Sequence, residues 1–396
     1  MTIFGSRKMT IKLWKSRTKI LKQLEVERHL NIKDDNYALD VFKDNNYYMM
    51  INGLESLFLR PLGNGHEYST KDYKGEFTFD DFVLFYRFDR DLFKVIFGIL
   101  EQFEEHLKTA IAYNFCKNHC KTLAETMQYT NKDNYVNPAS RPNYPFAQYQ
   151  NKDIIARFDK FILFRPGYLT SLINRNDSLS LANYTDDSYT ASGNVATYQD
   201  DHRNINSHVA VPFWVSIQSL SMGNLNYLCH YLSDDDLNSI LKDFNIKNPT
   251  GVSRLAFLNC LDVLCDLRNH CAHNELVTRF RSKQSIIIFS KLIENLDLYT
   301  YKHKNENGVL RRSTVNLYGT LKILGLYADL SPMLEIFKQY MFEFTKTHQN
   351  RNNDKDIGWN IFITFLDRIG RTKDSYHLYS DWLDLGIKNS SFQDYF

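Results

Sequence analysis

Residues that break helices are scarce in this chain, and this scarcity limits the folds open to it more than any motif does. Its 396 residues include only 8 Pro and 16 Gly. A β-sandwich or barrel needs frequent turns, and turns draw heavily on these two residue types. Apolar residues also recur at three- and four-residue steps over long stretches, most clearly over residues 80–118. The sequence therefore predicts an all-α, mainly helical fold.

The same periodicity places the individual helices. Residues 80–118 are expected to form two segments that meet near residues 89–91, with Asp89 as the N-cap of the second. Ser253 is a candidate N-cap for a later helix, and residues 285–290 fit either a short strand or a buried helix. Further helices are predicted at about residues 1–30, 39–59, 212–232, 251–273, 313–328 and 331–347.

Polar, helix-poor stretches suggest four segments along the chain. Residues 176–210 are rich in Ser, Thr, Asn and Asp and are expected to form a linker or insertion. They separate an N-terminal helical domain (1–175), which begins with a basic helix, from a catalytic region (211–300). A C-terminal helical region (301–396) follows.

Composition excludes several classes of protein. No apolar run approaches the roughly 20 residues that span a bilayer, and the N-terminus lacks the apolar core of a signal peptide. We therefore expect a cytoplasmic protein whose six cysteines are thiols. Cys116 and Cys120, or Cys265 and Cys271 with nearby histidines, lack the paired spacing of a structural zinc site. Neither a metal nor another cofactor is predicted, because glycine-rich phosphate loops and paired-carboxylate metal motifs are also missing.

Basic residues gather in two clusters although the net charge is only +2. Either cluster could follow an RNA backbone, and the alternative for each is an ordinary solvated surface. The second cluster flanks a predicted turn at residues 305–308. The candidate RNA-binding residues are Arg7, Lys8, Lys12, Lys15, Arg17 and Lys19 in the first cluster, and Lys302, Lys304, Arg311 and Arg312 in the second.

The predicted helix 251–273 carries the residues best suited to chemistry. Its apolar residues form one stripe, and a second face is expected to present Asn259, Asp262, Asp266, Asn269 and His273. Arg268 lies about 140° around an ideal helix from His273. The two side chains could converge if the helix ends or distorts here, or if a second subunit supplies one of them.

These residue types suit metal-independent cleavage of RNA. An imidazole with a pKa near neutrality can remove the proton from the 2′-hydroxyl that attacks the scissile phosphate, or protonate the leaving oxygen. A guanidinium can hold the phosphate and offset the charge that grows on its oxygens. By spacing alone, a structural role for these polar residues at a helix end is the better interpretation. In the catalytic alternative, Arg268 and His273 form the pair and Asn269 could orient the imidazole.

Three passages resemble one known family. Residues 267–275 read LRNHCAHNE, which resembles the R-N-x-x-A-H signature of HEPN-domain ribonucleases, and in particular of Abi-like proteins of the AbiD/AbiF type. Residues 212–225 (PFWVSIQSLSMGNL) and 100–109 (LEQFEEHLKT) resemble two further segments of that family in order and spacing. Gln218 and Lys108 depart from the pattern, because the family commonly has Glu and Arg there.

The resemblance implies a HEPN-like helical bundle with extra N- and C-terminal helices and a polar insertion. It also implies an abortive-infection toxin that defends against phage by cleaving cellular RNA. Homodimers or higher homo-oligomers, and restraint by a structured noncoding RNA, are further implications, with no role for a membrane. Arg268, Asn269 and His273 match the motif, and His270 is a lesser candidate in it.

Several alternatives stay open at this point. Asp266 and Glu104 are supporting candidates, although Glu101, Glu104, Glu105 and Lys108 could equally form one solvated helix face. Phe213 and Trp214 are predicted as core anchors rather than as platforms for nucleobases. In place of a toxin, the chain could be a non-catalytic HEPN module that senses RNA or a phage protein, or a housekeeping RNA-processing nuclease.

Overall fold

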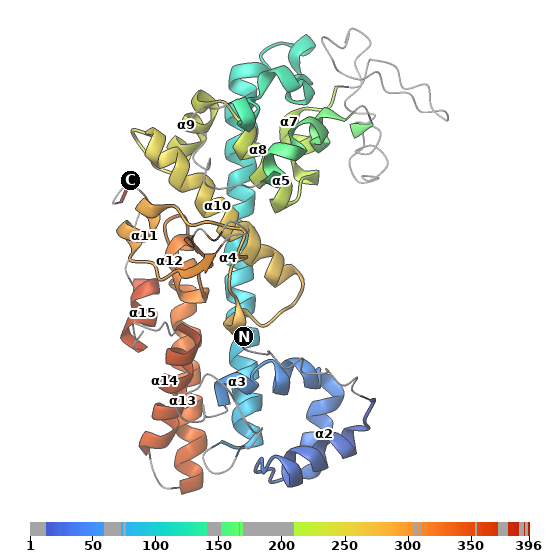
Figure 1. Cartoon of the computed structure of the whole chain (residues 1–396), viewed down its shortest axis with the longest axis vertical. Helices are drawn as coiled ribbons and strands as arrows, with labels where there is room; N and C mark the ends of the chain where they lie inside the picture. The colour runs from blue at the N-terminus through green and yellow to red at the C-terminus, as the bar shows by residue number, and fades with distance from the viewer. Residues whose placement is uncertain are drawn as a thin grey trace. The chain divides into compact units, whose positions relative to one another are not determined.

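The computed structural model describes residues 13–58, 73, 77–140, 152–165, 167–168, 210–304, 308, 310–352, 355–370, 379–387, 392 and 395–396. These residues are mainly helical and include one two-stranded sheet, which confirms the predicted fold class (Figure 1). Across the described residues, no helix is both long and apolar enough to traverse a bilayer. The polar segment predicted at 176–210 lies outside the described residues, apart from its last position.

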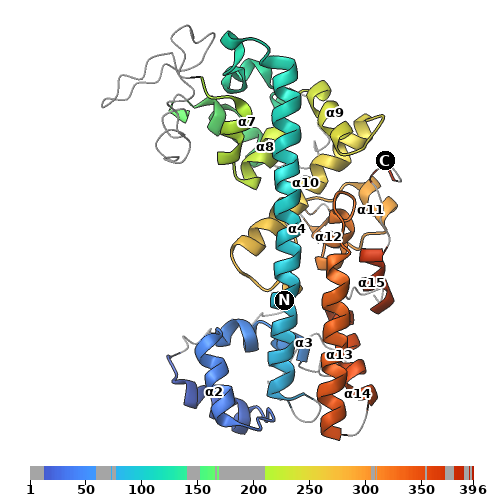
Figure 2. The same cartoon turned by 180° about the vertical axis from the view of Figure 1, so that it is seen from behind.

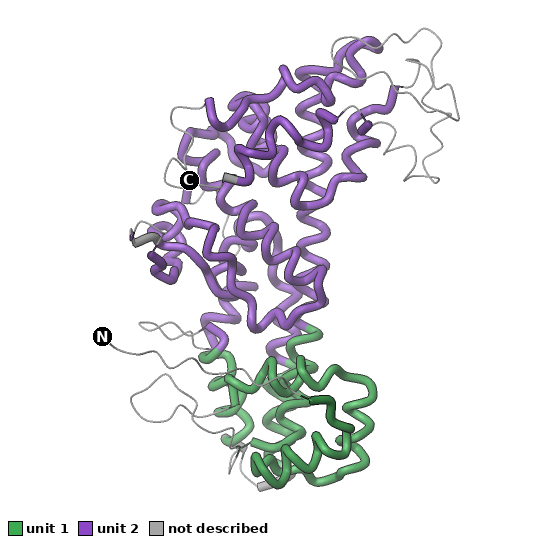
Figure 3. Tube along the Cα trace, turned by 45° about the vertical axis from the view of Figure 1, so that its right-hand side comes forward, with its two compact units in different colours: residues 1–91, 339–368 green, residues 92–338, 369–396 purple. Residues whose placement is uncertain are grey.

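The chain divides into two compact units, and neither is continuous in sequence (Figure 3). Unit 1 comprises Met1–Asp91 and Gln339–Arg368, and unit 2 comprises Leu92–Lys338 and Ile369–Phe396. A C-terminal segment thus belongs with the N-terminal residues, which differs from the four consecutive segments expected from composition. Residues 267–275 and the second basic cluster both belong to unit 2.

Unit 1 is built on an aromatic core. The Phe58 ring stacks on Phe82 with their centroids 3.7 Å apart, and Phe365 packs against Phe85 at 4.6 Å. Its elements are α1 (Arg17–Lys22), α2 (Asp35–Asp44), α3 (Glu55–Phe58), the first part of α4 (Phe79–His119), the last part of α13 (Pro332–Asn352) and most of α14 (Lys355–Gly370), with π-helical turns at Gln23–Glu27 and Tyr48–Asn52. The helix predicted at 39–59 is interrupted at Asn45, whose backbone is extended, and the helix predicted at 1–30 is described only from residue 13.

Unit 2 surrounds the C-terminal part of α4, around which α8, α9 and α10 gather (Figures 1 and 2). Its remaining helices and strands are α5 (Lys152–Arg157), α7 (Phe213–Ser216), α8 (Met222–Tyr231), α9 (Asp234–Asp243), α10 (Gly251–Ala272), α11 (Ser290–Leu296), β1 (Tyr301–Lys304), β2 (Leu310–Ser313), α12 (Leu317–Leu324), the first part of α13 and α15 (Tyr379–Ile387). Short 3-10 helices lie at Leu123–Glu125, Gln128–Thr130, Lys132–Asn134, Pro138–Ser140, Phe158–Lys160, Ile162–Phe164, Ile217–Ser219 and Val277–Arg279.

Two details of the predicted helices are wrong. Helix α4 is uninterrupted, and Asp89 is a buried residue within it rather than an N-cap. The Asp89 carboxylate pairs with the guanidinium of the adjacent Arg90, whose Nε donates to it at 3.0 Å. The N-cap of α10 is Thr250, and Ser253 takes the third helical position of a capping box with it.

Candidate active site

Helix α10 is enclosed on all sides through its middle and is accessible at its two ends. Every residue from Ala256 to Leu267 is buried, whereas Arg268, Asn269 and His270 are partly exposed. The helix then ends in a Schellman motif, in which the backbone N–H of Glu275 donates to the carbonyl of His270 at 3.3 Å. The motif residues therefore lie where a rigid helix reaches the surface.

The expectation that α10 presents a polar face is wrong for its first part. The buried Asn259 side chain donates to the carbonyl of Ile287 and accepts from the backbone N–H of Phe289, each at 2.8 Å. Asp262 is also buried and accepts from Asn226 Nδ2 at 2.9 Å. These polar groups fix neighbouring segments to α10, because buried polar atoms need partners.

Arg268 is held by a carboxylate from α4. Its Nε donates to Glu104 Oε2 at 3.1 Å, and Lys108 Nζ lies 3.1 Å from the other oxygen, Oε1. Glu104 is only 7% exposed, whereas its neighbours Glu101 and Glu105 are exposed. Glu104 therefore contacts the guanidinium of Arg268 and does not lie on a solvated helix face. No described residue accepts a hydrogen bond from the two terminal amino groups of Arg268.

His273 is exposed at the C-cap of α10, and its ring forms no hydrogen bond with any described residue. Its backbone N–H still donates to the carbonyl of Asn269 at 3.0 Å, so the helix remains regular up to this residue. On a regular helix, Arg268 and His273 are separated by about 140° around the axis and about 7.5 Å along it. The two side chains form no hydrogen bond with each other.

The other candidates in the motif have partners within the chain. His270 donates through Nε2 to the carbonyl of Leu276 at 2.8 Å, and its Nδ1 lies 3.1 Å from Glu275 Oε2. Asp266 accepts from the backbone N–H of Lys283 at 2.8 Å, and Asn269 Nδ2 donates to Cys265 Sγ at 3.7 Å. These contacts stabilise the end of α10 and the segment that follows it.

The predicted RNA-binding residues fall into separate parts of the structure. Arg7, Lys8 and Lys12 lie outside the described residues, as does the side chain of Arg311. Lys15, Arg17 and Lys19 are exposed in unit 1, although Arg17 Nε donates to the carbonyl of Phe42 at 3.1 Å and Lys15 Nζ to Gln23 Oε1 at 2.9 Å. The hairpin of unit 2 carries Lys302, Lys304 and Arg312, all exposed.

The hairpin places like charges opposite each other. Lys302 pairs with Arg312 in the antiparallel register of β1 and β2. Directly opposed cations destabilise a strand pair, and an anion bound across them would offset that repulsion. The cationic flanks were predicted from the sequence, whereas most of the turn predicted at residues 305–308 lies outside the described residues.

Trp214 shows that one prediction about α7 is wrong. Phe213 is buried as expected and stacks on Tyr129 with centroids 4.6 Å apart. Because Phe213 anchors α7 inward, the adjacent Trp214 faces solvent and is 60% exposed. No signal in the sequence marked this difference, because adjacent residues lie only about 100° apart on a helix and can both be buried.

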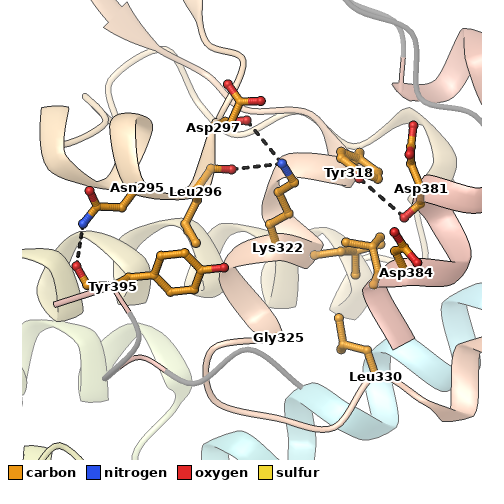
Figure 4. A pocket seen from close by; sticks show the side chains of 12 residues that line it. Asn295, Leu296, Asp297, Tyr318, Lys322, Gly325, Leu330, Asp381, Asp384 and Tyr395 are labelled. Carbon is orange, nitrogen blue, oxygen red and sulfur yellow. Dashed lines mark hydrogen bonds between the residues drawn. The ribbon is translucent and has the colours of Figure 1, made fainter. Parts of the chain in front are cut away.

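Two pockets have linings of opposite charge. A pocket of about 370 Å³ is bordered by the carboxylates of Asp297, Asp381 and Asp384 and by Lys322 (Figure 4). Lys322 Nζ donates to the carbonyl of Leu296 at 2.9 Å, and burial lowers the pKa of its ammonium. This acidic lining does not suit RNA. The second pocket has two lysines and no carboxylate in its lining.

No described cluster of three or more His, Cys, Asp or Glu side chains could hold a metal ion. At the end of α10, the structure presents the partly exposed guanidinium of Arg268 and the exposed imidazole of His273. The first can bind an anion and the second can transfer a proton.

Removing the charge of Glu104 tests how firmly Arg268 is held. The Glu104→Gln variant should unfold more easily by about 1–3 kcal/mol, because the half-buried Arg268 and Lys108 lose their shared counter-charge. The matched control is Glu105→Gln on the adjacent, exposed residue, which should change the free energy of unfolding by less than about 0.5 kcal/mol. Chemical unfolding of both variants measures the difference, and equal losses would contradict the proposed role of the carboxylate.

Comparison with known proteins identifies one match. Residues 40–278 match a family model described as Abi-like protein. Neither a curated protein nor a solved structure matches the chain. The matched residues include the α4 segment with Glu104, the α7 segment with Trp214 and the motif at the end of α10.

Proposed function

Because the chain belongs to the Abi-like protein family, which indicates a role in abortive infection, we propose that it is a HEPN-type, metal-independent endoribonuclease of the AbiD/AbiF kind. Its catalytic residues would be Arg268 and His273. One observation carries this proposal. The other polar side chains of the last turns of α10 have partners inside the chain, whereas the terminal amino groups of Arg268 and the ring of His273 have none among the described residues.

The chemistry follows from these two groups. The imidazole takes the proton of a 2′-hydroxyl, whose oxygen attacks the adjacent phosphorus, and the bond from phosphorus to the 5′-oxygen breaks. The leaving oxygen takes up a proton, so the products carry a 2′,3′-cyclic phosphate and a 5′-hydroxyl. The terminal amino groups of Arg268 offset the charge on the non-bridging oxygens. Glu104 positions Arg268 from behind through Nε.

Two copies of the chain are part of the proposal. A regular α10 directs Arg268 and His273 to different sides of one helix, so a dimer that pairs the two helix ends would combine Arg268 of one copy with His273 of the other. A bound structured noncoding RNA would restrain the toxin until infection, and cellular RNA would be its substrate.

The test is cleavage of RNA in the presence of a chelator. Purified protein should cut a single-stranded RNA in excess EDTA and leave 2′,3′-cyclic phosphate ends, which mass spectrometry identifies. The same sequence as DNA, or with 2′-O-methyl groups, should remain intact, because neither has a free 2′-hydroxyl. Cleavage of the DNA, or an absolute need for added divalent metal, would contradict the mechanism. RNA that binds without being cut would favour the non-catalytic sensor.

A further inference from the structure

We propose that the pocket between α4 and α7 binds an unpaired nucleobase of the RNA, stacked against Tyr113 and Trp214. This inference rests on the proposed function only in taking RNA as the ligand. We call this cavity the aromatic pocket and define it by Lys108, Tyr113, Cys116, Lys117, Trp214 and Gln218. Its volume is about 430 Å³, within the range of small-ligand sites in proteins.

Two short helical stripes form the walls of the aromatic pocket. On α4, Thr109, Tyr113 and Lys117 lie four residues apart and therefore share one face of the helix. On the other wall, Trp214 and Gln218 lie one turn apart, on α7 and the 3-10 helix that continues it. Both walls are regular elements, so the rings are carried on a rigid frame.

Both large rings of the aromatic pocket are unusually accessible. Tyr113 is 66% exposed and Trp214 is 60% exposed, and neither ring packs against another described aromatic ring. In contrast, Phe115 and Phe213 on the same two elements are fully buried against each other, with centroids 5.5 Å apart. The buried pair supplies the packing that holds the elements together, so the exposed pair is left for a ligand with a flat apolar face.

The charge of the aromatic pocket selects an anionic ligand. Lys108 and Lys117 line it, and no carboxylate does. Lys117 is exposed and forms no ion pair with any described residue. A ligand that combines a planar ring with negative charge fits this lining, and a nucleotide of single-stranded RNA has both, whereas a duplex keeps its bases stacked inside.

The aromatic pocket is connected to the candidate active site through one side chain. Lys108 lines the pocket and also contacts Glu104 Oε1 at 3.1 Å, while Glu104 Oε2 accepts from Arg268 Nε at 3.1 Å. A phosphate bound at Lys108 would therefore lie beside the carboxylate that positions Arg268. This arrangement predicts a preference for cleavage next to an unpaired nucleotide.

Binding measured without cleavage tests the inference. In an Arg268→Ala, His273→Ala background, Kd for a fluorescent single-stranded oligoribonucleotide should rise about 5- to 150-fold for Trp214→Ala and for Tyr113→Ala, the range reported for loss of one base stack. The control is Phe342→Ala, which removes an aromatic side chain that is also 66% exposed but lies in unit 1. Its Kd should be unchanged.

Alkylation of Cys116 gives a second readout. A hydrogen bond from Cys120 lowers the pKa of the Cys116 thiol, so iodoacetamide should label it at a lower pH than an ordinary cysteine. The oligoribonucleotide should protect Cys116 from labelling. Unchanged Kd for both aromatic variants, unprotected Cys116, or a loss of dimer on Trp214→Ala without a change in Kd would overturn the inference.

The outcomes separate the two proposals. RNA that binds in the aromatic pocket but is never cut would leave this inference standing and would overturn the proposed ribonuclease. RNA that is cut normally by Trp214→Ala and Tyr113→Ala, with wild-type Kd, would overturn the pocket and leave the ribonuclease standing.

Discussion

Substitution of either Arg268 or His273 by Ala is expected to slow RNA cleavage by about 100-fold or more. Loss of a general base typically lowers a rate by about 10²–10⁴, and loss of one group that stabilises transition-state charge by about 10²–10³. Cells that express either variant should grow, whereas the wild-type chain should arrest them. The measurement is the initial rate of cleavage of one RNA by purified variants, with growth as the cellular readout.

The matched control is Arg254→Ala. Arg254 lies on the same helix, α10. Its guanidinium donates hydrogen bonds to Asp234 Oδ2 at 2.8 Å and to Asn238 Oδ1 at 2.9 Å. We expect this variant to cleave RNA at the wild-type rate. Arg268→Lys should not restore activity, because a lysine cannot bind a phosphate in bidentate fashion. Full activity in His273→Ala would remove the imidazole from the mechanism.

Mixing the two inactive variants tests whether the site is shared between copies. If Arg268 of one chain acts with His273 of the other, an equal mixture should recover about a quarter of the wild-type activity, because half of the dimers are mixed and each has one complete site of two. If both residues act within one chain, the mixture should stay inactive. The regular geometry of α10 leads us to expect recovery.

The second large effect is on stability and concerns unit 1. His348 Nε2 lies 2.8 Å from Asp81 Oδ1, and both side chains are buried. We expect His348→Ala to lower the free energy of unfolding by about 3 kcal/mol or more, because the Asp81 carboxylate would remain buried without this partner. Urea unfolding measures the loss, and hydrogen exchange should locate it in the first turns of α4.

His273→Ala serves as the control for this prediction as well. Its ring is exposed and without a hydrogen bond among the described residues, so its loss should change stability by less than about 0.5 kcal/mol. An Asp81→Asn, His348→Leu double variant should regain part of the stability, because no carboxylate is then left buried without its partner. Equal stability of His348→Ala and His273→Ala would show that the buried pair contributes nothing.

The sequence alone was enough to predict the helical class, the approximate positions of α4, α8, α10, α12 and α13, and the motif at the end of α10. Helical periodicity is a local property, and the three- and four-residue spacing of apolar residues in α4 and α10 indicates which faces of these helices are packed. Arg268 and His273 lie within one short motif, and the resemblance of that motif to a known family singled them out.

Only the tertiary structure decided which polar groups remain free. The sequence could not show that Asn259, Asp262 and Asp266 are satisfied inside the fold, because their partners lie on other segments. It also could not show whether Glu104 is solvated or buried, because the burial of Glu104 depends on the contact between α4 and α10. The outward position of Trp214 was decided in the same way, by the packing of Phe213 against Tyr129. Long-range packing determines these features, and no local pattern encodes it.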